Sequence, residues 1–150
     1  MQPTNAYFGQ KDAAQCCLIR RIVNDLDMPV NVVVLDTVRE LDGLAMSSRN
    51  TYLSFAEREA APVVYRSLCK ARDLYLAALH REPISADVLK GAVQSVLESE
   101  SLVTQVQYIA IDDRETMRPI AKVGQEGAII SLACKIGSVR LIDNIVLKPC

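Results

Sequence analysis

The sequence predicts an α/β protein in two parts, a parallel βαβ unit followed by a small α+β unit with an antiparallel sheet. In the first 35 residues, a short apolar strand, a segment with helical periodicity and a β-branched run follow one another. In the last third of the chain, three segments have the composition of strands, with turn residues between them. The 150 residues, 50% hydrophobic and 23% charged, are enough for one ordinary domain or for parts of two.

The βαβ unit begins with residues 6–8, a brief apolar strand that Gly9 ends. A helix is expected over about residues 12–27, because its apolar residues keep the spacing of one helical face. Asp12 and, three residues later, Gln15 form a capping-box pattern at the start of this helix.

The second strand is the nearly continuous β-branched run of residues 30–35, which is typical of a strand covered on both faces. The succession of strand, helix and strand predicts parallel pairing. Two parallel strands do not make a stable sheet alone, because their faces and edges need partners. We therefore expect the chain to begin inside a larger α/β domain, whose first part is missing or is supplied by another chain.

Two polar loops follow these two strands. In open parallel sheets, ligands bind beyond the C-terminal ends of the strands, so residues 9–12 and residues 36–50 are expected to share one rim. Lys11 stands at a helix start, where the helix dipole already favours an anion. An ordinary solvated lysine is the alternative for Lys11, and helix capping is the alternative to a functional role for Asp12 and Gln15.

The second loop carries two adjacent hydroxyls, a guanidinium and a carboxamide, on Ser47, Ser48, Arg49 and Asn50, and Gly43 precedes them. Hydroxyls and backbone N–H groups donate to phosphate oxygens, and a planar arginine can bind two of these oxygens at once. The glycine lets the backbone bend. This set predicts a phosphate-binding loop, and a polar connector that caps the next helix is the alternative.

Residues 36–42 connect the second strand to this loop. Val38 is interpreted either as the wall of a site for a flat ring or as a core residue. Arg39 and Glu40 are interpreted as solvated surface charges.

The second unit is expected to place helices before strands. Ser54 and Glu57 form a second capping box, and Ser85 is expected to cap a later helix. The helices are expected over about residues 62–78 and 85–97, and the strands over about residues 105–110, 128–134 and 139–146. Gly137 and Ser138 supply a tight turn between the last two strands. We place the boundary between the two units near residues 47–54.

Composition and charge exclude several classes of protein. The net charge of −1 gives no overall attraction to nucleic acid or to an anionic membrane. No apolar run reaches about 18 residues and no basic-then-apolar leader is visible, so neither a spanning helix nor a leader is expected. The five cysteines form no CxxC pair, which favours thiols in a reducing, cytoplasmic compartment over disulfides or a zinc site. The single histidine, His80, is interpreted as a surface residue.

Several motifs together resemble the pantothenate synthetase (pantoate–β-alanine ligase) family. In chain order they are Phe8-Gly9-Gln10-Lys11-Asp12 with Gln15, Asp42-Gly43-Leu44-Ala45-Met46-Ser47-Ser48-Arg49-Asn50 with Tyr52-Leu53, Val106-Gln107-Tyr108, and Arg140-Leu141-Ile142-Asp143-Asn144. The resemblance covers essentially the whole chain. It implies the C-terminal part of a Rossmann-like nucleotidyltransferase domain over residues 1–50, and a small C-terminal α+β lid domain over residues 51–150.

The resemblance implies an enzyme that condenses pantoate with β-alanine, using ATP and Mg²⁺. Pantoate attacks the α-phosphate, which releases pyrophosphate and leaves pantoyl adenylate. The amine of β-alanine then attacks the activated carbonyl and gives pantothenate and AMP. The implied partners are these small molecules, with neither nucleic acid nor membrane, and members of the family are usually homodimers.

Carried over position by position, the resemblance implies ATP-binding roles for Gly9, Gln10, Lys11, Asp12, Val38, Met46, Ser47, Ser48 and Arg49. Among these, Lys11, Ser47, Ser48 and Arg49 would be catalytic, because adenylyl transfer needs donors and positive charge where pyrophosphate charge develops. Gln15 would bind pantoate, and no protein ligand to a metal is expected. Arg140, Asp143 and Asn144 are expected to hold the C-terminal sheet together.

The family's Met-Gly-x-Leu-His-x-Gly-His segment, whose two histidines bind ATP phosphates, is absent from these residues, as is its N-terminal glutamine. We therefore expect this chain alone to bind ATP weakly and not to catalyse. One alternative is a non-catalytic fragment that acts as a lid or interaction module. Another is a different adenylate-forming enzyme that shares the loop, against which Gln15 and the motif at residues 140–144 argue.

Overall fold

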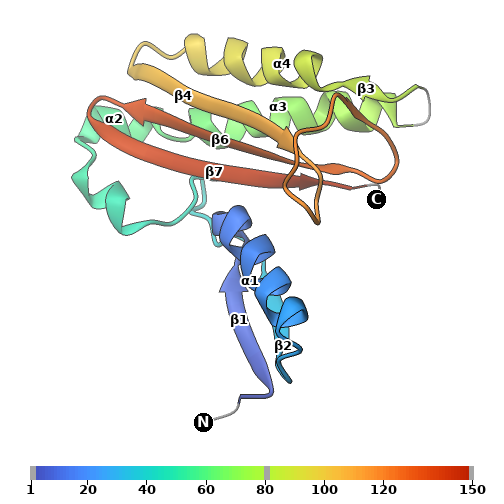
Figure 1. Cartoon of the computed structure of the whole chain (residues 1–150). Coiled ribbons are helices and arrows are strands. Elements are labelled where there is room, and N and C mark those ends of the chain that lie inside the picture. Colours follow the sequence, from blue (N-terminus) through green and yellow to red (C-terminus); the bar gives the residue numbers. More distant parts are fainter. Residues whose placement is uncertain (1–2, 80–81, 149–150) are drawn as a thin grey trace.

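The structure, a computed structural model, describes residues 3–79 and 82–148. A small parallel βαβ unit projects from a larger unit of helices and antiparallel strands (Figure 1). This arrangement confirms the predicted α/β fold class. His80, predicted to be on the surface, and Cys150 lie outside the described residues.

The βαβ unit comprises β1 (Asn5–Gly9), the 3-10 turn η1 (Gln10–Asp12), α1 (Ala13–Asp25) and β2 (Asn31–Leu35). β1 and β2 pair in parallel, as predicted. The predicted capping box at the start of α1 is wrong, because the side chain of Asp12 makes no capping hydrogen bond. The backbone of Asp12, at φ −101° and ψ 61°, does not have the extended conformation usual for a capping residue.

The coverage predicted for the second strand is only partly present within the described residues. The central valines of β2 are half-buried, and Leu35 at its end is 54% exposed. One helix, α1, and one partner strand are the neighbours of β2 in this unit. Large apolar side chains accordingly remain exposed on this unit, namely Tyr7, Leu18, Ile22, Leu26, Met28 and Leu35.

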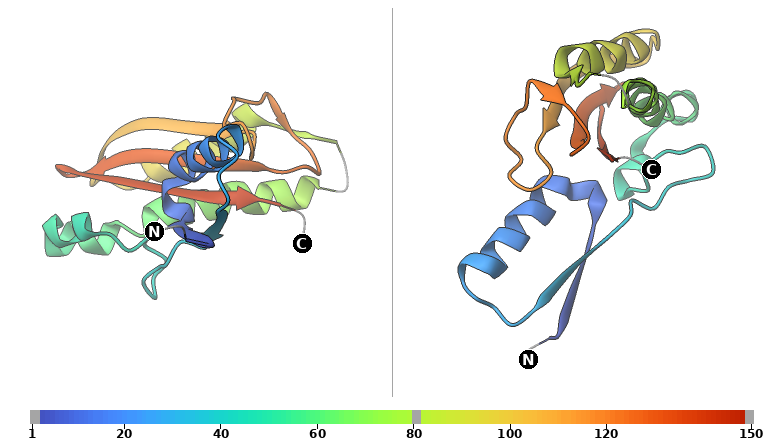
Figure 2. Two further views of the ribbon diagram at one scale, coloured as in Figure 1. Left: turned by 60° about the horizontal axis from the view of Figure 1, so that its bottom comes forward. Right: turned by 90° about the vertical axis from the view of Figure 1, so that its right-hand side faces the viewer.

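The α+β unit is built on a three-stranded antiparallel sheet. Its strands are β4 (Val103–Asp112), β6 (Ala128–Ile136) and β7 (Val139–Leu147), in the order β4-β6-β7. The helices α3 (Val63–Ala78) and α4 (Ala86–Glu98) cover one face of this sheet, and the βαβ unit approaches from the β7 side (Figure 2). The remaining elements are η2 (Ser48–Tyr52), α2 (Phe55–Ala60), and the short antiparallel pair β3 (Ile84–Ser85) and β5 (Lys122–Val123).

Local signals in this unit match the structure. Ser54 and Glu57 form a reciprocal capping box at the start of α2, and Ser85 caps α4 by accepting from the Asp87 N–H. Gly137, at φ +55°, lies in the turn between β6 and β7. These predictions are confirmed because each depends on contacts within a few residues.

The core of the α+β unit lies between α3, α4 and the sheet, and its largest fully buried side chains include Leu68, Tyr75 and Leu89. Leu44, from the loop that follows β2, belongs to the same core and is 3% exposed. That loop is therefore fixed to the α+β unit by apolar packing. The predicted boundary near residue 50 stays a prediction. Among the described residues, no helix has both the length and the apolar character needed to cross a bilayer.

We expect Gly127→Ala to lower the free energy of unfolding by about 1–3 kcal/mol. Gly127 has φ +76°, and an added Cβ would lie 1.9 Å from the carbonyl oxygen of Leu147. Gly91, in α4, provides the matched control, because a Cβ there meets no atom within 4 Å. Gly91→Ala should raise stability by about 0.5–1 kcal/mol. Urea unfolding of both variants measures the difference, and a shift of the same sign would contradict the structure.

Candidate active site

The lysine turn, residues 9–12, links β1 to α1 and rests against β7. The side-chain amide of Asn144 donates to the carbonyl oxygens of Gln10, at 3.0 Å, and Lys11, at 2.8 Å. The Gln10 side chain in turn donates to Oδ1 of Asn144, at 3.1 Å. These contacts fix the lysine turn on the C-terminal sheet, and Lys11 is half-buried there.

The serine loop, residues 43–50, begins in the second arm of a short backbone hairpin formed by residues 38–46. The N–H of Met46 donates to the carbonyl of Val38, at 3.0 Å, and the N–H of Glu40 donates to that of Leu44, at 2.8 Å. Gly43, at φ +91°, makes the bend under the ring of Tyr65, where a Cβ would lie 2.3 Å from a ring carbon. The predicted role of Gly43 in bending the loop is thus confirmed.

Side chains within the serine loop fix its shape. The Ser47 oxygen accepts from the N–H of Arg49, at 3.2 Å, which caps the 3-10 turn η2. The Asn50 side chain donates to the carbonyl of Ala45, at 3.1 Å. Capping, the alternative considered for this loop, is therefore present at Ser47. The capping bond uses only one lone pair of the Ser47 hydroxyl oxygen. The hydroxyl proton can still be donated to a ligand.

Arg39 is not a solvated surface charge as predicted, because it pairs with a buried carboxylate. Its guanidinium bonds both carboxylate oxygens of Asp143, at 2.6 and 3.0 Å, and donates to the carbonyl of Gly43. The same group stacks on the ring of Tyr65, 3.9 Å from the ring centroid. Burial raises the pKa of the Asp143 carboxyl, and the hydrogen bonds from Arg39 and the charge of Lys11 act in the opposite direction.

Arg140, Asp143 and Asn144 are predicted to hold the C-terminal sheet together. This prediction is confirmed for Arg140 and wrong for Asp143 and Asn144. Arg140 crosses the sheet and donates to the side chain of Gln107 on β4, at 2.6 Å. Asp143 and Asn144 instead bind the hairpin and the lysine turn. No local sequence signal indicates these contacts, because the partners lie more than 100 positions away.

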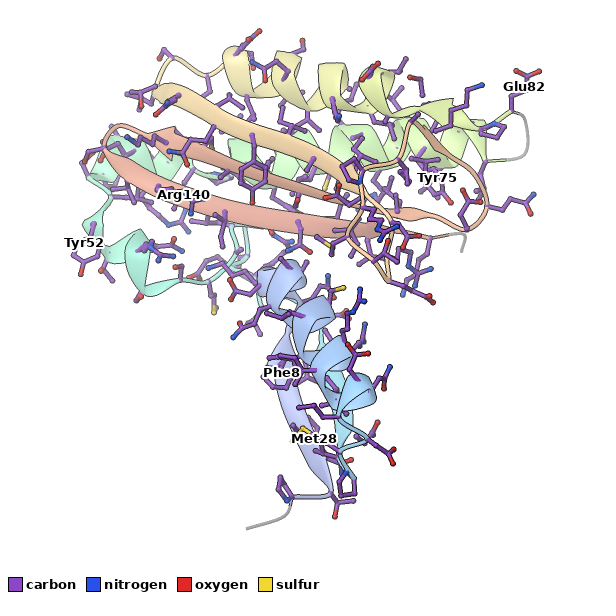
Figure 3. All side chains as sticks on the ribbon, viewed as in Figure 1. Phe8, Met28, Tyr52, Tyr75, Glu82 and Arg140 are labelled. Carbon is purple, nitrogen blue, oxygen red and sulfur yellow. The ribbon has the colours of Figure 1, made fainter. Side chains whose placement is uncertain are left out.

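The lysine turn and the serine loop line one common hollow beside β7. Lys11, Ser47 and Arg49 contribute to its wall, together with Asn50 and the β7 residues 140–143. Its volume is about 10 Å³, which is room for roughly one water molecule. In this conformation the hollow has no room for a phosphate group between the serine loop and β7. Figure 3 shows Phe8 on β1 of the βαβ unit and Arg140 on β7 of the sheet.

A second cavity, of about 150 Å³, adjoins Lys11 on the other side. Asp12 and Gln15 lie along it, facing Tyr108 and Ile142 of the sheet. Lys11 lines both hollows, so the structure brings together the residues predicted to bind phosphates and the residue predicted to bind pantoate.

The other predicted residues lie outside these two hollows. Val38 is 66% exposed and is therefore not a core residue of the described part of the chain, and Met46, paired with it across the hairpin, is 46% exposed. Ser48 and Gly9 are exposed beside the site, and Gln10 is turned towards Asn144. The individual roles of all these residues stay predictions.

The donor set suits an anion better than a bare metal ion. Within the part of the chain that the structure describes, no three His, Cys, Asp or Glu side chains form a metal-binding group. Mg²⁺ in nucleotide sites is usually held by one or two carboxylates together with phosphate oxygens and waters. The residues here fit Mg²⁺ in that form only, with Asp12 as the carboxylate along the second cavity that is not already paired with an arginine.

Comparison with known proteins shows the family. Residues 1–146 match the family model described as pantoate-beta-alanine ligase, and the chain belongs to this family. It is 47% identical over 147 residues to a pantothenate synthetase of Herpetosiphon aurantiacus, covering 98% of this chain and 51% of that protein. The chain thus spans about half the length of these curated relatives.

Solved structures agree with this assignment. The pantothenate synthetase of Thermus thermophilus matches with a TM-score of 0.88 and 40% identity, over 99% of this chain and 51% of that one. A Francisella tularensis pantoate-beta-alanine ligase, described as complexed with beta-gamma ATP and β-alanine, matches with a TM-score of 0.61 and 28% identity, over 99% and 46%. These matches confirm the predicted fold of both parts of the chain.

We expect Arg39→Ala to lower the free energy of unfolding by about 3–5 kcal/mol, because it leaves the Asp143 carboxylate buried without its partner. Arg58→Ala is the matched control. Arg58 also contacts an aspartate at 2.6 Å, but the side chains of Arg58 and Asp42 are 35% and 39% exposed, against 17% and 1% for Arg39 and Asp143. The exposed pair should contribute less than about 1 kcal/mol. Equal losses in a denaturant titration would show that burial of the Arg39 pair has no such effect.

Proposed function

We propose that this chain supplies the phosphate-binding and lid parts of a pantoate–β-alanine ligase. The reaction is the ATP-dependent condensation of pantoate with β-alanine through pantoyl adenylate, with release of pyrophosphate and AMP. The observation that carries the proposal is the common hollow, where Lys11, Ser47 and Arg49 meet from two separate segments. Membership of the family supports the same conclusion.

The chemistry of the hollow suits the first half-reaction. Negative charge develops on pyrophosphate as its bond to the α-phosphorus breaks, and fixed cations and donors beside that group lower the barrier. Lys11 and Arg49 would provide the cations and Ser47 a hydroxyl donor within the hollow, and the exposed Ser48 would provide a second hydroxyl beside it. No protein nucleophile is needed, because the carboxylate of pantoate attacks the phosphorus directly.

The remaining parts of the substrates would lie around this hollow. Pantoate would occupy the cavity along Gln15, next to Lys11, and the adenine would lie against the exposed apolar side chains of Val38 and Met46. Gly9, Gln10 and Asp12 would contact ATP from the lysine turn. When bound, Mg²⁺ would neutralise phosphate charge, and Asp12, which lines the adjoining cavity, would be a candidate carboxylate from this chain. The ATP and β-alanine described for the Francisella relative support these substrates.

We further propose that the 150 residues alone do not turn over substrate. The parallel sheet has two strands and leaves large apolar side chains exposed, and the most similar relatives are about twice as long. The site would become complete when the N-terminal half of such an enzyme covers the βαβ unit, in one cytoplasmic protein or homodimer.

Complementation tests the function. We expect no AMP release from ATP, pantoate and β-alanine with the chain alone, and turnover when the separately produced N-terminal half of the Herpetosiphon relative is added. In that mixture, Lys11→Met and Arg49→Gln should each lower kcat by about 10²–10³, the usual cost of losing one transition-state donor. AMP is measured in a coupled assay.

Lys122→Met is the matched control, since Lys122 is an exposed lysine on β5, in the short pair with β3. Its rate should stay within twofold of the unmodified mixture. Turnover by the chain alone would refute its proposed dependence on a second half. A complemented mixture that forms no AMP would favour a non-catalytic lid or interaction module.

A further inference from the structure

Two adjacent polar residues are buried in β7, a strand otherwise rich in apolar side chains. Asp143 and Asn144 are 2% and 3% exposed. In the sheet they lie opposite Leu132 and Ser131 of β6, and neither side chain bonds to that strand. Burial of polar groups costs free energy unless their hydrogen bonds are made, and an apolar pair would serve the sheet at least as well.

The two side chains reach different segments, because consecutive residues of a strand point to opposite sides. Asp143 binds Arg39 and thereby the hairpin that carries the serine loop. Asn144 binds the lysine turn through three hydrogen bonds. The two segments that line the common hollow are thus both fixed by one dipeptide of the C-terminal sheet.

The bonding pattern at Asn144 requires a carboxamide. Its Nδ2 donates to two carbonyl oxygens, which can only accept, and its Oδ1 accepts from Gln10. A carboxylate of the same shape has no proton to donate, so it would place acceptor against acceptor at both carbonyls. The side-chain amide is therefore oriented by its partners.

We propose that Asn144 is a positioning residue for nucleotide binding. It holds the backbone of Gln10 and Lys11 on β7 and so sets where the Lys11 ammonium meets the phosphates, while Asp143 sets the serine loop through Arg39. This inference rests on the proposed function. It adds that the lid, and not only the nucleotide-binding half, determines the geometry of the phosphate site. Displacements of about 1 Å in such sites cost up to about 10²-fold in rate.

A double-mutant cycle with ATP as the probe tests this role in the full chain. We expect Asn144→Leu, which adds no charge, to raise the ATP dissociation constant about tenfold. In a Lys11→Met background the same substitution should change it less than twofold, because Asn144 acts through Lys11. Equal effects in both backgrounds, or no effect in the first, would overturn the proposal.

Amide hydrogen exchange provides a second, ligand-free measurement. Asn144→Leu and Asn144→Asp should speed exchange at residues 9–12 and leave α3 and α4 unchanged. Ser67→Ala is the control for a general loss of stability, because Ser67 is fully buried and bonds only within α3, to the Val64 carbonyl. Unchanged exchange at residues 9–12 would overturn the proposal. If the unmodified chain bound no ATP, exchange would decide whether Asn144 holds the turn, and the complementation assay would decide the proposed function separately.

Discussion

The buried ion pair between Arg39 and Asp143 is the constraint on which the rest of the structure depends. A carboxylate this deeply buried is stable only with a bidentate partner, and Arg39 provides one while also binding the carbonyl of Gly43 and the ring of Tyr65. The hairpin therefore has one position relative to β7. Leu44, packed in the core, adds an apolar contact at the same point. Together with Asn144, these contacts join two units that share little other surface.

Short-range features could be predicted from the sequence. The parallel strand pair, the capping box at Ser54 and the turn at Gly137 each depend on residues close in the chain, and each is present. The common rim was also predictable, because both loops follow parallel strands. The capping box at Asp12 failed because a 3-10 turn, which the pattern does not reveal, precedes the helix.

Long-range pairing could not be predicted. Arg39 has the composition of a surface residue in its own segment, and only the approach of β7, about a hundred residues later, gives it a buried partner. The same holds for Asn144, whose partners are the carbonyls of a distant turn. A single sequence contains no signal for such contacts, whereas the motifs that identify the family lie in continuous segments. Family membership was thus more accessible than the contacts that position the candidate site.

The small volume of the hollow has an energetic consequence. Because the hollow has room for about one water molecule, the proposed triphosphate would need a more open conformation than the one described here. The affinity for nucleotide would then equal the intrinsic affinity reduced by the fraction of open molecules. Part of the binding energy would be used to separate the serine loop from β7. A substitution that loosens only the serine loop, and leaves the lysine turn held by Asn144, would then tighten nucleotide binding while weakening the fold.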